Sequence, residues 1–99
     1  MAKFQVVGDT KYSKEELATV IMGHLRSRLS EIELQILDLR KTIEGLEKKY
    51  GVSWEAFREK FVRSELGEDA DLDYVEWHAA VELLRELSRE SDMLAEVLS

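Results

Sequence analysis

The chain has 99 residues, of which 44% are hydrophobic, and its 14 basic and 21 acidic residues give a net charge of −7. This length suits one small domain, residues 1–99, and the acidic balance argues against a nucleic-acid-binding protein, which would carry a basic surface. The chain has no cysteine, which excludes disulfides and cysteine–zinc sites and is typical of the reducing cytoplasm, where we expect the protein. No apolar run is long enough to cross a membrane, and no basic start precedes one as in a secretory signal.

Amide side chains are scarce. Asparagine is absent, and Gln5 and Gln35 are the glutamines of the chain. Few thermolabile amides together with many Glu, Lys and Arg residues are typical of a thermophile's protein. A preference for helix gives a similar composition, because these charged residues are good helix formers.

The first segments predict a short strand followed by a long helix. Residues 3–7 favour a strand that needs a partner, such as the same segment of a second chain. A capping box formed by Ser13 and Glu16 then begins a helix over residues 14–50, and Gly51 suits a left-handed helix end. We expect this helix to be continuous, because proline is absent from the chain.

An apolar heptad pattern runs along the predicted long helix. Apolar side chains recur at alternating spacings of four and three, which is typical of a coiled coil. The helix is about 55 Å long at 1.5 Å per residue, whereas a compact chain of this size is only about 35 Å across. We therefore expect a second copy of the chain to cover part of the pattern. The predicted homodimer seam consists of Met22, Leu25, Leu29, Ile32, Ile36, Leu39, Ile43 and Leu46.

The charges beside this seam indicate how two copies would align. One flank carries charges of alternating sign at spacings of seven: Arg26, Glu33, Arg40 and Glu47. In an antiparallel pair this flank meets its own copy, and each arginine then lies opposite a glutamate. The other flank opposes this alignment, because it brings Arg28 near Lys49. We predict an antiparallel dimer, with the third helix of the same chain as the competitor for the seam.

Two further helices are predicted. Ser53 suits the N-cap of a short helix over residues 53–65, and acidic residues favour the start of a third helix over residues 72–98. The simplest assembly is an all-α helical hairpin, in which helices 14–50 and 72–98 pack antiparallel and the short helix folds over the turn end. The third helix is too short to cover the whole long helix, whose amino-terminal part stays available to a partner.

Aromatic residues gather at the turn end of this predicted hairpin. The cluster consists of Trp54, Phe57, Phe61, Tyr74 and Trp77, with Tyr50 beside it. The interpretation we favour is a small core that fixes the short helix onto the hairpin. The alternative is a partner-binding surface, because tryptophan and tyrosine dominate such surfaces.

The sequence offers no arrangement typical of an active site. His24 and His78 lie in different predicted helices, without a shared carboxylate. The glutamates at positions 82, 86 and 90 have arginine neighbours, which is typical of a solvated helix face. We therefore predict no catalytic residue, no metal site and no cofactor, and we do not expect an enzyme.

Three short segments resemble a group of small acidic helical proteins of archaea and bacteria, some of them antitoxin-like. The segments are residues 48–57 (KKYGVSWEAF), residues 65–69 (ELGED) and residues 74–77 (YVEW). The resemblance implies a helical protein that dimerises and neutralises a basic cognate toxin. Operator binding is not expected, because the chain has no recognisable DNA-binding module. The alternative function is a structural or scaffolding coiled-coil homodimer.

Overall fold

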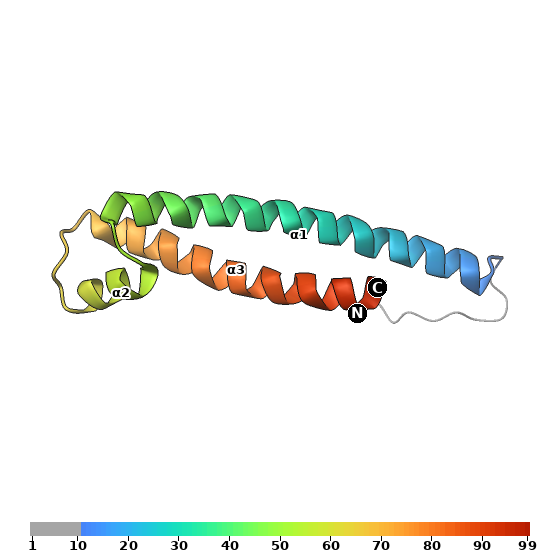
Figure 1. Cartoon of the computed structure of the whole chain (residues 1–99). Coiled ribbons are helices and arrows are strands. Elements are labelled where there is room, and N and C mark those ends of the chain that lie inside the picture. The colour runs from blue at the N-terminus through green and yellow to red at the C-terminus, as the bar shows by residue number, and fades with distance from the viewer. Residues whose placement is uncertain (1–10) are drawn as a thin grey trace.

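The computed structural model describes residues 11–99, which form three helices and contain no strand. These are α1 (Lys14–Tyr50), α2 (Trp54–Val62) and α3 (Ala70–Leu98), and α3 packs antiparallel on α1 while α2 lies at the turn end (Figure 1). The all-α hairpin predicted from the sequence is therefore confirmed. The strand expected over residues 3–7 lies outside the described residues.

The ends of α1 follow from its capping residues. The Ser13 hydroxyl accepts a hydrogen bond from the Glu16 amide at 3.0 Å, and the Glu16 carboxylate accepts one from the Ser13 amide at 3.3 Å. At the other end Gly51 has a φ of 68°, and its amide donates to the Glu47 carbonyl. Glycine adopts this left-handed conformation without strain, so the helix stops here as predicted.

The short helix ends three residues earlier than expected. Ser64 has a positive φ of 57°, and its amide donates to the Phe61 carbonyl while the Glu65 amide donates to the Lys60 carbonyl. This pair of bonds is a Schellman motif, which usually requires glycine at the position of Ser64. Because the sequence shows no glycine there, the prediction of residues 53–65 overran the end of α2 at Val62.

The third helix begins two residues earlier than expected, at Ala70. The Ala70 amide donates to the Gly67 carbonyl and the Asp71 amide to the Glu68 carbonyl, so a tight turn leads directly into the helix. Ala70 is itself buried against Phe57 and Trp77, which explains why the helix begins at this small apolar residue.

The molecule is long and thin, with extents of 66 × 24 × 18 Å. Its radius of gyration is 20.3 Å, whereas a compact domain of this length has a value of about 13 Å. The cause is the length of α1, which has 37 residues against the 29 of α3. The amino-terminal end of α1 consequently extends past the end of α3 (Figure 1).

The apolar seam of α1 faces α3 within the same chain. Ile32 is fully buried and Leu46 is 5% exposed, while the six other predicted seam residues are half-buried. Trp77, Ala80 and Leu87 are the buried residues of α3 that lie along this contact. One chain therefore covers the middle of the seam by itself, and the third helix is the neighbour of these residues.

Candidate partner-binding site

The five aromatic residues predicted to cluster are brought together at the turn end. The rings of Phe57 and Trp77 are 4.8 Å apart between centroids, and both side chains are fully buried. Trp54, Phe61 and Tyr74 surround them and are half-buried, with the rings of Phe61 and Tyr74 stacked at 4.0 Å. Phe57 and Trp77 are thus core residues, whereas the other three keep a solvent-facing edge.

Tyr50, which was predicted to lie beside this cluster, is in contact with it, and His78 joins it as a further member. Tyr50, at the end of α1, lies 4.6 Å from Phe57 between ring centroids. His78 lies 5.8 Å from Trp54 and 6.1 Å from Tyr74, with its ring parallel to that of Tyr74. From the sequence, His78 was predicted only to lie apart from His24 without a shared carboxylate, and not to belong to this cluster. Its spacing of four from Tyr74 was the signal that both residues share one face of α3.

A groove between α2 and α3 opens beside the cluster and has a volume of about 370 Å³. Its apolar lining comes from Trp54, Val62 and Val81. Charged side chains form its rim: Glu55, Arg58, Glu59 and Arg85. An apolar floor with a charged rim suits an amphipathic segment of another protein better than a small polar substrate.

The turn end also exposes large apolar side chains outside the groove floor. Val62 is 72% exposed on α2, and Leu72 and Val75 are 82% and 64% exposed on the first turns of α3. The partner-binding residues predicted from the sequence are all aromatic, and these three aliphatic residues were not among them. The eight-residue spacing of Trp54 and Val62 was the available signal, because it places both on one face of a helix.

A polar network holds the end of α1 against the start of α3. Lys49 Nζ lies 2.6 Å from Asp73 Oδ2, and the Tyr50 hydroxyl donates a hydrogen bond to the same carboxylate oxygen. Lys49, and then Tyr50, lower the pKa of the Asp73 carboxyl below its usual value. The bond to Asp73, with desolvation adding to it, raises the pKa of the Tyr50 hydroxyl. These three residues fix the position of the aromatic cluster between the two long helices.

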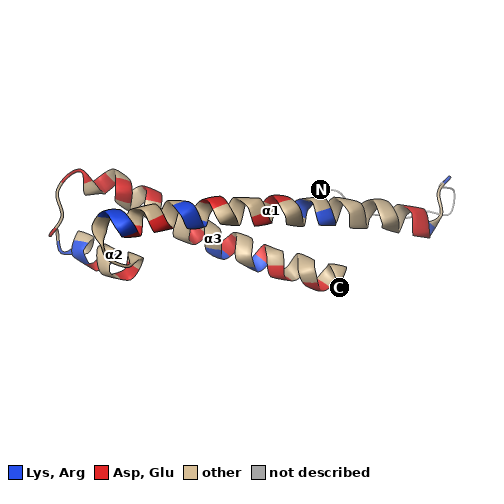
Figure 2. Ribbon diagram, turned by 45° about the horizontal axis from the view of Figure 1, so that its top comes forward, with Lys and Arg blue, Asp and Glu red and all other residues tan. Residues whose placement is uncertain are grey.

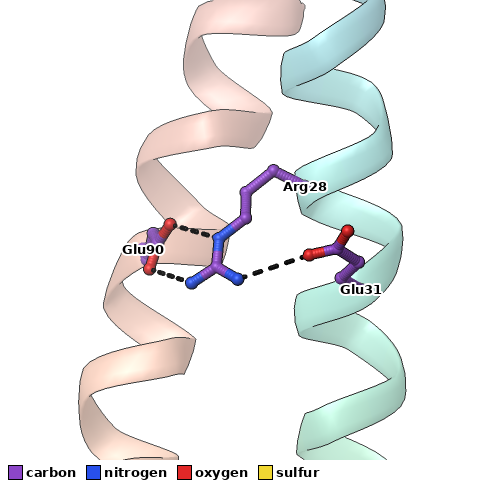
Figure 3. A network of polar contacts seen from close by, with 3 residues as sticks. All are labelled: Arg28, Glu31 and Glu90. Atoms are coloured by element: carbon purple, nitrogen blue, oxygen red, sulfur yellow. Dashed lines mark hydrogen bonds and ion pairs between the residues drawn. The ribbon is translucent and has the colours of Figure 1, made fainter.

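A second network joins the same helices near the other end of the hairpin (Figure 3). Arg28 contacts Glu90 of α3 and Glu31 of its own helix. The hydrogen bond from Arg28 lowers the pKa of the Glu90 carboxyl, and the same bond raises the pKa of the Arg28 guanidinium. Both residues are thus held in their charged forms, which stabilises the contact between the helices.

Acidic residues predominate around the site. The α3 helix carries eight acidic residues and two arginines. Figure 2 shows acidic residues gathered in the loop before α3 and in its first turns, at the turn end of the hairpin. A positively charged ligand would therefore bind more favourably to this end of the molecule than a negatively charged one.

The described residues offer little for metal or membrane chemistry. Residues 11–99 contain no group of three or more His, Asp or Glu side chains placed to hold a metal ion. His24 lies in α1 and His78 in α3, where its neighbours are aromatic rings. None of the three described helices is long and apolar enough to cross a membrane.

Comparison with known proteins gives no match: no family model, curated protein or solved structure is similar to this chain.

Proposed function

We propose that this chain is a cytoplasmic, non-catalytic protein-binding module that acts as an antitoxin, neutralising a basic cognate toxin at the α2–α3 groove. The observation that carries the proposal is the position of Val62, which is 72% exposed on the wall of an apolar groove. Isolated surface aliphatics are common, but one that borders a groove is favourably placed to be covered by a partner.

The groove has the composition of a binding hot spot. Trp54 connects its floor to the aromatic core, so this side chain is held rigidly before any partner binds. A rigid aromatic anchor loses little conformational entropy on binding, which favours affinity. The arginines on the rim, Arg58 and Arg85, would then pair with acidic residues that flank the bound segment.

The overall charge supports a basic partner. The net charge of −7 and the acidic first turns of α3 create a negative field around the turn end. Such a field speeds the association of a positively charged protein and orients it during the encounter. A small basic toxin fits this requirement, and the resemblance of residues 48–57 and 74–77 to antitoxin-like proteins points to the same function.

The test uses the reading frames that flank this gene in its native host. We expect one of them to encode a small basic protein whose expression alone arrests growth, and whose co-expression with this chain restores growth. Val62→Arg should abolish the rescue, because it places a charge on the apolar wall and repels a basic ligand. Leu34→Arg is the matched control, since Leu34 is 65% exposed on α1, far from the groove.

The proposal is wrong if no flanking product is toxic. It is also wrong if Val62→Arg and Leu34→Arg rescue growth equally well.

A scaffolding homodimer is the second candidate function. The observation that favours it is a row of exposed charges on α1: Arg26, Glu33, Arg40 and Glu47. When two copies of α1 run antiparallel, each arginine of the row lies opposite a glutamate of the other copy. The growth-rescue test separates the two functions, because a scaffold would form the dimer but would leave the growth arrest by a flanking product unchanged.

A further inference from the structure

One side of α1 is left partly open by the hairpin. The side consists of half-buried apolar residues, Met22, Leu29, Ile36 and Ile43, and of the exposed row Arg26, Glu33, Arg40 and Glu47. We propose that a second copy of this chain docks antiparallel along this side of α1, so that two hairpins form a four-helix bundle. This inference concerns self-association, and it does not depend on the neutralisation of a toxin.

The open side is a strip along α1 that lies next to the strip covered by α3. A groove of about 350 Å³ runs along it, lined by Arg40, Ile43, Glu44 and Glu47 of α1 and by Leu84 of α3. Ile43 also packs against the buried core cluster, so its outer edge alone faces the groove. In four-helix bundles each helix contacts two neighbours about a quarter turn apart, and α3 provides one of them for α1. The groove marks the place along α1 where the second neighbouring helix would pack.

The charges on this side have no partner within the hairpin. The ion pairs among residues 11–99 involve other side chains, and none includes a member of the row. The signs along the row alternate at a spacing of seven, so an antiparallel copy sets Glu33 opposite Arg40 and vice versa. The same alignment sets Arg26 opposite Glu47. Each of these contacts occurs twice by symmetry, and all four are attractive.

The two cations on the other flank of the seam are paired within the chain and do not face the second copy. Arg28 and Lys49 would repel one another if both faced the second copy. Instead Arg28 binds Glu90 at 2.9 Å and Lys49 binds Asp73 at 2.6 Å, both on the side of α1 that faces α3. The groove on that side is lined by Arg28 and Leu87, and it is separate from the groove lined by Arg40. The repulsive pair is therefore neutralised within each chain.

A parallel arrangement on the same side is disfavoured. A two-fold symmetric parallel pair would place each residue of the row beside its own copy, so that arginine meets arginine and glutamate meets glutamate. Such like-charge contacts are destabilising. In the antiparallel alignment the two-fold axis passes between Ile36 and Leu37, and about 28 residues of each α1 overlap over about 42 Å. Leu37 is 55% exposed and would be covered there.

The experiment is sedimentation equilibrium of the full chain at low salt. We expect a dimer at micromolar concentration. Glu33→Arg converts two attractive contacts into repulsive ones and should weaken dimerisation at least about tenfold. Adding Arg40→Glu to that variant restores the opposite signs and should restore dimerisation. Asp38→Arg is the matched control, because it makes the same change of charge at an exposed residue about 140° around α1 from Glu33, beside the separate groove lined by Arg28 and Leu87, and it should leave the dimer unchanged.

A cross-linking experiment tests the direction of the helices, since the chain has no cysteine. Leu37→Cys lies next to the two-fold axis and should form a disulfide between copies, whereas Met22→Cys should not. Circular dichroism confirms that each variant keeps its helices. A monomeric wild type, an equal effect of Asp38→Arg and Glu33→Arg, a failure of the charge swap, or a disulfide at position 22 would each overturn the proposal. Loss of toxin rescue with an intact dimer would overturn the antitoxin function alone.

Discussion

Arg28 of α1 and Glu90 of α3, which are 62 residues apart in the chain, form a two-point contact between the two long helices. Arg28 Nε lies 2.9 Å from Glu90 Oε2, and Arg28 Nη2 lies 3.2 Å from Glu90 Oε1 (Figure 3). A planar guanidinium that meets both carboxylate oxygens fixes distance and orientation together. With Lys49 and Asp73 at the turn end, the pair fixes the alignment of α1 against α3 at two points along the hairpin.

Replacing Arg28 should test this alignment directly. We expect Arg28→Lys to lower the midpoint of thermal unfolding almost as much as Arg28→Gln, because lysine keeps the charge but loses the two-point geometry. The loss should be small and should shrink in high salt, since both side chains are partly exposed. Arg85→Gln is the control, because Arg85 binds Glu82 within one helix. A loss that is insensitive to salt would contradict an electrostatic role.

The seam of α1 should respond to truncation according to its burial. Ile32 is fully buried against α3, so Ile32→Ala should lower the free energy of unfolding by about 2–5 kcal/mol. Leu34 is two residues away but 65% exposed, and Leu34→Ala should change the stability by less than about 0.5 kcal/mol. Urea unfolding of both variants measures the difference. Equal losses at the two positions would contradict the packing of α3 on this face.

The sequence predicts the helices of this protein well because their signals are local. Ser13 with Glu16, and Gly51, mark the ends of α1 by residue type alone, and the heptad spacing identifies the face that α3 covers. The end of α2 escaped prediction because Ser64 adopts a left-handed conformation, which its residue type does not indicate. A tertiary contact, rather than a local signal, extends α3 back to Ala70.

The candidate site was predicted only in part. The spacing of the five aromatic residues in the sequence correctly predicted that they cluster. It did not predict that Phe57 and Trp77 are buried while the other members are half-buried. That distinction depends on the angle at which α2 crosses α3, which no local pattern specifies. The groove with Val62 and Val81 was missed for the same reason, since its walls belong to two helices whose relative position becomes known only in three dimensions.

The two tryptophans should differ in fluorescence. Trp77 is fully buried, so the variant Trp54→Phe, which retains Trp77, should emit at short wavelength and resist quenching by iodide. Trp54 is half-buried at the groove, so the variant Trp77→Phe should emit at longer wavelength and be quenched. A bound partner should protect Trp54 alone. Strong quenching of Trp77 in the folded protein would contradict the packing described above.

Two glycines in and beside α1 should respond oppositely to alanine. A Cβ atom at Gly45 meets nothing within 4 Å, so Gly45→Ala should stabilise the protein by about 1 kcal/mol through helix propensity. Gly51 has a φ of 68°, and Gly51→Ala should destabilise it by about 1 kcal/mol, because alanine is strained in the left-handed conformation. Thermal unfolding of both variants measures the two changes. A loss of stability in Gly45→Ala would indicate that another chain packs against this glycine.

The ion pair at the turn end should make stability depend on pH at both extremes. Lys49 and Tyr50 lower the folded-state pKa of Asp73 below its usual value of 3.8, so its stabilising effect is complete above that pH. The effect is lost as the pH falls through the lower, folded-state pKa, where the carboxylate takes up a proton. The pKa of Tyr50 is raised above 10.0, so its contribution is present below pH 10 and is lost as the pH rises through the folded-state value. Urea unfolding across these ranges should show both declines, and Asp73→Asn should weaken both, because Asp73 is the partner common to Lys49 and Tyr50. An alkaline decline that is unchanged in Asp73→Asn would show that the hydrogen bond from Tyr50 does not stabilise the fold.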